Sequence, residues 1–178
     1  MSRANRRQWI RRVVFSVLLL LWMGLVFGFS AQTAATSSQL RGGVCHTIAS
    51  LLWDDFETLP IVQQQEIIGT LQVIVRKTAH FCEYALGGAL ALGFFMTFSF
   101  SRRKQVLCAV LFVAANAVLD EGHQLFVDGR APMVTDILLD TVGGLCAIGA
   151  ILGIGYLWQR RRQGLDNSAV FDNNNKEE

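Results

Sequence analysis

Four long apolar runs, separated by short polar segments, divide this chain of 178 residues. They predict an all-α integral membrane bundle of four transmembrane helices, at roughly 13–30, 78–100, 105–121 and 134–158. As a helix the first run would span about 27 Å, since each residue adds about 1.5 Å, and the hydrocarbon core of a bilayer is about 30 Å thick. The second and third runs are shorter and reach this length only by including polar residues at one end.

A basic segment, residues 1–12, precedes the first run. A basic start, an apolar core and small residues after it are also the pattern of a cleaved signal peptide. The core here, Val13 to Ser30, is longer than the roughly 7–15 residues usual for a signal peptide. We therefore expect a retained membrane helix, although the sequence leaves cleavage open as the alternative.

The segment between the first two runs, residues 31–76, contains no run long enough to cross a membrane. Apolar residues recur in two parts of it at helical spacing, which predicts two short amphipathic helices on the outer membrane surface or capping the bundle. Pro60 separates the two parts. The apolar positions are Val44, Ile48, Leu51 and Leu52 in the first part, and Ile67, Ile68, Leu71, Ile74 and Val75 in the second.

Composition and charge support lipid as the solvent and give the orientation. Of the residues, 52% are hydrophobic and only 17% are charged, against about a quarter charged in a soluble domain. Twelve of the sixteen basic residues fall in cytoplasmic segments if both termini lie in the cytoplasm, as the positive-inside rule requires. The polar tail, residues 159–178, is expected to be disordered. The twelve are Arg3, Arg6, Arg7, Arg11, Arg12, Arg102, Arg103, Lys104, Arg160, Arg161, Arg162 and Lys176, while Arg41, Arg76, Lys77 and Arg130 lie outside.

Several chemistries find no support in the sequence. The four cysteines, Cys45, Cys82, Cys108 and Cys146, form no CxxC pair and no cluster with histidine, so they are expected to be scattered apolar side chains. No serine or cysteine stands convincingly beside a base, and no phosphate-binding glycine loop or nucleic-acid motif occurs. Because topology explains the basic cytoplasmic ends, no nucleic-acid partner is expected.

Polar residues gather at the outward ends of the last three predicted helices, and their spacing puts them on one face of each helix. Small residues on these faces let a neighbouring backbone approach closely. The simplest packing turns the three faces towards a common polar pocket, covered by the loop 126–130. The faces are formed by Arg76, His80, Glu83, Tyr84 and Gly87; by Asn116, Asp120, His123 and Gln124, with Glu121 beside them; and by Asp136, Asp140, Gly143, Gly144 and Ala147.

A charge in mid-membrane costs at least roughly 2–3 kcal/mol, so such residues mark a functional site by default. A structural alternative is that Arg76, Lys77 and Arg130 only pair with nearby carboxylates and fasten the helix ends together. Tyr84 would then be an interfacial anchor. The number of titratable groups favours a functional site over helix fastening alone.

Three chemistries fit these residue types. Acid–base catalysis uses closely spaced, buried carboxylates, and its candidates are His80, Glu83, Asp120 and Glu121. Recognition of an anionic head group uses the basic side chains, with the carboxylates taking sugar hydroxyls or an amine. A metal site would use His80-x-x-Glu83 or Glu121-x-His123, but neither spacing matches a strong metal motif. The sequence therefore predicts no metal ligand and names no cofactor.

Three ordered blocks in this region resemble the signatures of the VanZ-like family. Residues 76–84 (RKTAHFCEY) resemble RKxxHxxEY, residues 120–130 (DEGHQLFVDGR) resemble DExHQxFxPGR, and residues 136–143 (DILLDTVG) match DxxxDxxG. Phe29-Ser30-x-Gln32 resembles a weaker feature. Asp128 stands where the family usually has proline. The resemblance covers roughly residues 13–158.

The resemblance implies a multi-pass protein of the bacterial cytoplasmic membrane, with a Gram-positive source expected. It also implies a link to antibiotic resistance, because the family is named for a member that raises resistance to the lipoglycopeptide teicoplanin. Beside the four catalytic candidates, the signature positions expected to bind a ligand are Arg76, Lys77, Tyr84, His123, Gln124, Arg130, Asp136 and Asp140.

We expect the outward pocket to bind or modify a cell-envelope lipid or glycolipid. The sequence does not decide whether the protein is an enzyme. One alternative is a non-enzymatic binding or accessory subunit that holds the lipoglycopeptide or assists another envelope protein. A small transporter is a further alternative, but no polar residues continue along the cytoplasmic halves of the helices.

Overall fold

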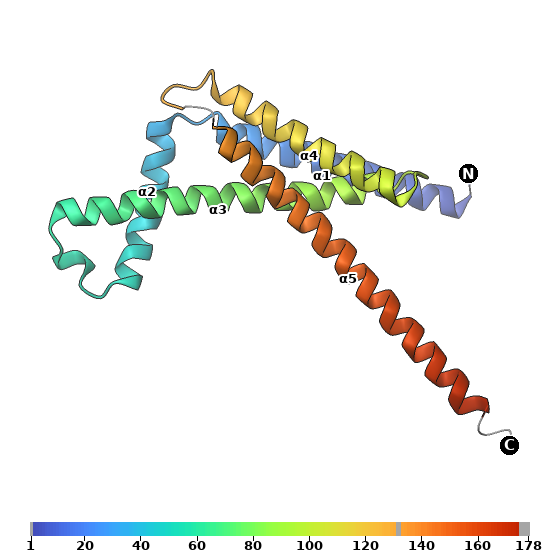
Figure 1. The fold of residues 1–178 in the computed structure, drawn as a ribbon. Coiled ribbons are helices and arrows are strands. Elements are labelled where there is room, and N and C mark those ends of the chain that lie inside the picture. The colour runs from blue at the N-terminus through green and yellow to red at the C-terminus, as the bar shows by residue number, and fades with distance from the viewer. Residues whose placement is uncertain (1, 131–132, 175–178) are drawn as a thin grey trace.

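The computed structural model describes residues 2–130 and 133–174 (Figure 1). Within these residues it contains five α-helices and one 3-10 helix, and no strand. The predicted all-α class is therefore confirmed. The elements are α1 (Arg3–Ser30), α2 (Ala34–Leu52), η1 (Phe56–Thr58), α3 (Ile61–Phe95), α4 (Arg102–Gln124) and α5 (Val134–Asn174).

The predicted number of spanning helices is wrong. Among the described residues, three helices rather than four are long and apolar enough to cross a membrane: α1, α4 and Val134–Gln163 of α5. The predicted second span, residues 78–100, belongs to α3, which ends at Phe95. The apolar part of α3 after Tyr84 is short, and charged and polar side chains in the preceding turns lower the hydropathy of any longer window.

The two predicted amphipathic helices do not appear as separate surface elements. The second of them continues without a break into the predicted span, because no proline interrupts the chain between Pro60 and Phe95. The first corresponds to α2, which packs against α3 and in which Cys45 and Ala49 are buried. The apolar residue Leu51 is 77% exposed, so this apolar face of α2 is not buried in the bundle.

Both ends of the chain extend the helices beyond the predicted spans. The basic segment 1–12 is mostly helical within α1, where the Ser2 hydroxyl accepts a hydrogen bond from the Asn5 amide. At the other end α5 continues past Trp158 into the segment predicted to be a disordered tail. The last residues of that segment, with Lys176, lie outside the described residues.

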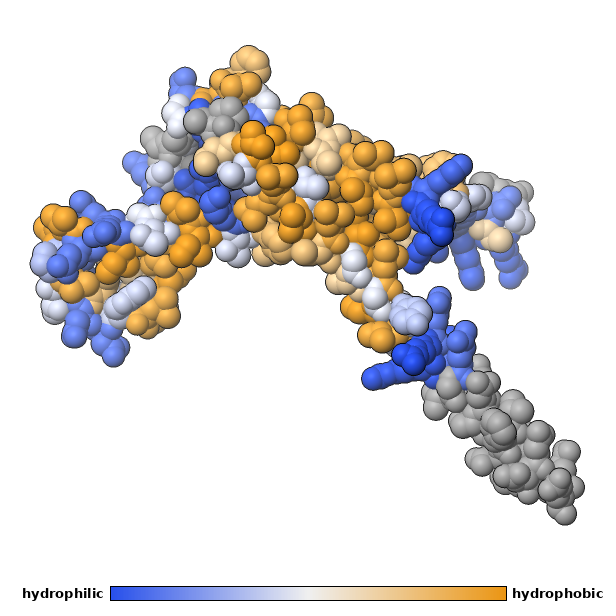
Figure 2. Space-filling view, in the orientation of Figure 1, coloured by the Kyte–Doolittle hydropathy of each residue, from blue (hydrophilic) through white to orange (hydrophobic). Residues whose placement is uncertain are grey.

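The surface of the bundle is apolar between hydrophilic ends, as Figure 2 shows. Leucines on α1 and α4 project away from the core; Leu20 is 68% exposed and Leu111 is 58% exposed. A soluble protein rarely exposes apolar patches of this extent, whereas a membrane protein exposes them to the hydrocarbon core of the bilayer. The exposed band supports a multi-pass membrane protein.

The core of the bundle lies between α1, α3, α4 and α5. Trp22 on α1 is its largest member and meets Tyr84 on α3 edge to face, with ring centroids 5.5 Å apart. The indole Nε1 donates a 2.8 Å hydrogen bond to the carbonyl oxygen of Glu83. Trp22 therefore fixes α1 against the turn of α3 that carries Glu83 and Tyr84.

Glycines allow α3 and α5 to cross in direct backbone contact. A Cβ atom at Gly88 would lie 2.5 Å from the carbonyl oxygen of Gly144, and one at Gly143 would lie 2.5 Å from the carbonyl oxygen of Phe81. Small residues serve this purpose in membrane helix pairs, where close packing replaces the hydrophobic effect. The crossing brings Asp140, one turn before Gly144, against the turn of α3 that carries His80.

The basic end of the bundle is fastened by hydrogen bonds between α1 and the turn after α3. The side chains of Gln8 and Arg12 donate to the carbonyl oxygen of Thr97 at 2.7 and 3.0 Å. The Arg12 guanidinium also lies 4.1 Å from the centroid of the Phe98 ring. These contacts hold one end of the bundle, while the pocket described below lies at the other.

Candidate functional site

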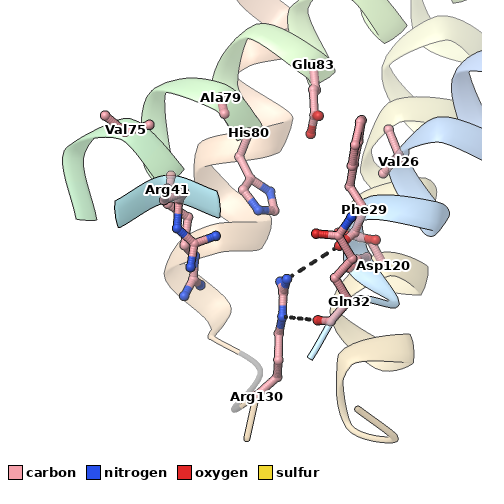
Figure 3. A pocket seen from close by; sticks show the side chains of 12 residues that line it. Val26, Phe29, Gln32, Arg41, Val75, Ala79, His80, Glu83, Asp120 and Arg130 are labelled. Atoms are coloured by element: carbon pink, nitrogen blue, oxygen red, sulfur yellow. Dashed lines mark hydrogen bonds between the residues drawn. The ribbon is translucent and has the colours of Figure 1, made fainter. Parts of the chain in front are cut away.

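A pocket of about 240 Å³ lies where α1, α2, α3 and α4 meet the loop before α5 (Figure 3). Five of the predicted site residues line it: Arg76, His80, Glu83, Asp120 and Arg130. Its lining combines apolar and charged side chains. The remaining lining residues are Val26, Phe29, Ser30, Gln32, Arg41, Val75 and Ala79.

The middle of α3 supplies one side of the pocket. Arg76, His80 and Glu83 recur at intervals of four and three residues, which places them on one helix face, as predicted. Figure 3 shows His80 and Glu83 directed from α3 towards Asp120, which comes from α4. Helical periodicity thus accounts for the site residues that α3 contributes.

Three ionisable side chains from three helices meet beside the pocket. His80, Asp120 and Asp140 each place a nitrogen or carboxylate oxygen within 4.8 Å of the others. The Nδ1 atom of His80 lies 3.4 Å from Oδ1 of Asp140. Both carboxylates are fully buried. Gln124 donates to Oδ2 of Asp120 at 3.4 Å and to the Ser30 hydroxyl at 3.0 Å, which orients this carboxylate.

Asp136 forms the second buried charge cluster, one turn before Asp140 on α5. Its carboxylate pairs with the guanidinium of Arg76, and Nζ of Lys77 lies 3.4 Å from Oδ1. The side chain of Asp136 is 3% exposed, so this pair ties the start of α5 to the middle of α3 away from bulk solvent. The pairing of Arg76 and Lys77 with a carboxylate, which was the structural alternative, is confirmed for Asp136.

Three arginines from different segments surround the pocket. Arg41 comes from α2, Arg76 from α3 and Arg130 from the loop before α5. The pKa of Arg41 is lowered from its ordinary value, first by burial and then by the charges of Arg130 and Arg76. Burial, followed by the charge of Arg76, also lowers the pKa of Arg130. The three guanidinium groups therefore repel one another across the pocket.

The loop 126–130 contributes only Arg130 to the lining and does not cover the pocket as a whole. Gly129 has φ of 75°, a left-handed conformation that favours glycine and directs the chain back to the pocket. Nε and Nη2 of Arg130 donate to the carbonyl oxygens of Gln32 and Phe29 at 3.2 and 3.4 Å. Phe126 instead points away and is 87% exposed.

Seven predicted site residues do not line the pocket, and three of them, Gln124, Asp136 and Asp140, make the contacts already described. Tyr84 is fully buried in the core against Trp22, one turn deeper than His80. Glu121 accepts a 2.8 Å hydrogen bond from the Met133 amide and is buried. The His123 ring stacks on Phe27, with centroids 6.0 Å apart. Lys77 is occupied by its ion pair with the carboxylate on α5.

Sequence reasoning missed Arg41 as a site residue. Arg41 is the only arginine or lysine between positions 31 and 75, which is the signal that could have marked it. Its contribution depends on how α2 lies across α3, and that packing is not readable from periodicity. Trp22 was missed for the same reason, since its contact with Glu83 joins residues 61 positions apart.

The fold and the site together define a helical membrane protein with a small pocket lined by arginines and carboxylates. The family model described as VanZ/LLP1 matches residues 15–158, and the chain belongs to this family. The resemblance seen in the sequence blocks is thereby confirmed. No curated protein and no solved structure matches the chain.

Proposed function

We propose that this protein binds the anionic head group of a cell-envelope lipid or glycolipid in the pocket between α1, α2 and α3. The observation that carries the proposal is the convergence of Arg41, Arg76 and Arg130 on one small pocket. Guanidinium groups recognise phosphate and carboxylate groups through paired hydrogen bonds. An anion between them would replace their mutual repulsion by attraction.

The shape of the pocket suits part of an amphiphile. Its volume of about 240 Å³ is below the roughly 300–1,000 Å³ of pockets that enclose a drug-sized molecule. It has room for a head group but not for acyl chains. Val26 and Phe29 on α1 and Val75 on α3 add apolar side chains to the lining, and the outer surface of the bundle is apolar. A lipid chain would leave past these apolar side chains into the bilayer.

The proposed orientation puts the pocket on the outer side of the cytoplasmic membrane. The start of α1, the start of α4 and the Arg160–Arg162 segment of α5 carry most of the basic residues, and the pocket lies at the opposite end of α1 and α4. The positive-inside rule assigns basic ends to the cytoplasm. Both termini would then be cytoplasmic and the segment 31–76 extracytoplasmic.

Modification of the bound lipid would rely on the ionisable groups that the pocket exposes. His80, Glu83 and Asp120 face the space where the head group would lie, whereas Glu121 does not reach it. General acid–base catalysis needs such groups within hydrogen-bonding reach of the substrate. These three residues are the catalytic candidates if the bound lipid is turned over.

The family name supports an extension to teicoplanin. A protein that holds an envelope lipid at the outer surface would change what a lipoglycopeptide meets there. Binding of the lipoglycopeptide itself by the same pocket is the accessory form of this proposal. In a strain where loss of the gene alters teicoplanin susceptibility, pocket substitutions would alter it in the same direction.

Arg130→Gln and Arg41→Gln are each expected to weaken binding of phosphatidylglycerol by about tenfold or more. The reason is the loss of a charge-assisted hydrogen bond, which contributes about 1.5–3 kcal/mol. Native mass spectrometry of the full chain in detergent would measure this, with phosphatidylcholine as the neutral lipid. Arg160→Gln is the matched control at the other end of the bundle. Equal binding of the two lipids, or an equal loss in the control, would contradict the proposal.

A further inference from the structure

We propose that His80, Asp120 and Asp140 form a binding site for a divalent transition-metal ion of the Zn²⁺ type at the inner edge of the pocket. The proposal concerns the same region as the proposed function but goes beyond it, because the ion would bind without any lipid. The three side chains come from α3, α4 and α5, so the site exists only in the folded bundle.

The burial of two carboxylates side by side is the first argument. Asp120 and Asp140 are both fully buried, and each has an oxygen within 4.8 Å of the other and of a His80 nitrogen. Two like charges at this distance in a dry environment are strongly unfavourable unless one carboxyl group is protonated or a positive charge lies between them. Arg76 and Lys77 are occupied by Asp136. A protonated His80 would supply one charge for two carboxylates, whereas a divalent ion would neutralise both.

The second argument is the state of the carboxylate oxygens. Within the described part of the chain, neither oxygen of Asp140 accepts a hydrogen bond, and Oδ1 of Asp120 accepts none either. Buried polar atoms are nearly always hydrogen-bonded or bound to a metal. His80 Nδ1 lies 3.4 Å from Asp140 Oδ1 without the alignment of a hydrogen bond. One candidate ligand atom from each of the three side chains lies within 4.8 Å of the other two, as metal ligands do.

Ligand type and geometry favour a borderline divalent ion. One imidazole and two carboxylates suit Zn²⁺ better than Ca²⁺ or Mg²⁺, which take oxygen ligands. Zn–N and Zn–O distances of about 2.0–2.2 Å place ligand atoms roughly 3.3 Å apart in a tetrahedral site. The His80–Asp140 separation already has this value, and side-chain rotation would bring Asp120 closer. Three protein ligands would leave a position open, and His80 and Asp120 both line the pocket.

Local spacing does not predict this ligand set, because the three residues are 40 and 20 positions apart in the chain. The close approach of α5 to α3 at Gly143 and Gly144 is what brings Asp140 to His80. Asp120 is held in place by Gln124, which also bonds to Ser30 on α1. Such second contacts orient ligand carboxylates in metal sites.

The test is metal binding by the full chain in detergent, stripped with a chelator and supplied with Zn²⁺ and no added lipid. We expect about one bound Zn²⁺ per chain by elemental analysis, and a rise in the unfolding temperature that the chelator reverses. His80→Gln and Asp140→Asn are each expected to weaken Zn²⁺ binding about 100-fold or more. His46→Gln, which changes a half-exposed histidine on α2 outside the pocket lining, serves as the control and should bind like the unchanged chain.

Co²⁺ provides a second readout that does not depend on stability. It should give a visible absorption spectrum that is lost in His80→Gln and kept in His46→Gln. Size-exclusion profiles of the metal-free variants identify those that fold, and two independent ligand variants keep the test decisive. Absence of stoichiometric Zn²⁺, or equal binding by the ligand variants, would overturn the site. Since no lipid is present, that failure would leave the lipid proposal standing.

Discussion

Gly88→Ala is expected to lower the free energy of unfolding by about 3 kcal/mol, near the upper end of overpacking effects. The added methyl group would lie 2.5 Å from the carbonyl oxygen of Gly144 and 2.8 Å from its Cα atom. These neighbours are backbone atoms, so the clash cannot be relieved by a rotamer change, and α3 and α5 must separate. Thermal unfolding of the full chain in detergent should show a fall of roughly 6–12 °C.

The control for this prediction is Gly149→Ala on α5. A Cβ atom there meets nothing within 4 Å, and alanine favours the helix over glycine by about 1 kcal/mol. Gly149→Ala should therefore be neutral or slightly stabilising. If Gly88→Ala were as stable as Gly149→Ala, α3 and α5 would not cross in direct backbone contact. The placement of Asp140 beside His80 would then also be wrong.

Asp136→Asn is the substitution with the second large expected effect. It keeps the size of the side chain but removes the charge that Arg76 and Lys77 share. Breaking a buried ion pair costs about 3–5 kcal/mol, and we expect about 3 kcal/mol because Arg76 and Lys77 are partly exposed. The loss also leaves Arg76 beside the other two pocket arginines without its counter-charge. Chemical denaturation of the purified chain would measure the change.

Two comparisons separate this effect from a general loss of acidic charge. Asp128→Asn, in the exposed loop at the same end of the bundle, should change stability by less than about 0.5 kcal/mol. In the double variant Arg76→Gln with Asp136→Asn, the cost should be smaller than the sum of the two single costs, because neither charge is left alone. Additive costs would show that the pair does not hold α5 to α3.

Helical periodicity predicts much of the site because the site residues lie on helices. The intervals between Arg76, His80 and Glu83 place them on one face, and the structure has them along one side of the pocket. Periodicity does not show, however, how deeply a side chain on that face lies within the bundle. Tyr84 follows His80 by four residues on the same face, yet one turn carries it about 6 Å further into the core, against Trp22.

The number of spanning helices and the continuity of α3 could not be read reliably from the sequence. An amphipathic surface helix and a spanning helix share the same period, so the pattern alone does not show where one ends and the next begins. In α3 the two are one helix, Ile61–Phe95, because nothing in that stretch breaks it. The charged residues near its middle then make it too polar to qualify as a span.

The remaining site residues could not be placed from the sequence because their positions depend on contacts between distant segments. Arg41 reaches the pocket because α2 packs on α3, and Asp140 reaches His80 because two glycines let α5 touch α3. Both arrangements depend on side-chain volumes at helix crossings rather than on local pattern. The predicted common polar pocket is therefore present, but which residues line it is determined by helix packing.

The central claim is that the pocket opens at the outer face of the membrane, and cysteine labelling of the full chain tests it most directly. In a chain whose four natural cysteines are replaced, Gln32→Cys places a thiol in the pocket and Ser101→Cys places one at the basic end. On intact cells a membrane-impermeant maleimide should label Gln32→Cys, and should label Ser101→Cys only after the membrane is permeabilised. Labelling of Ser101→Cys on intact cells, with Gln32→Cys protected, would contradict the account.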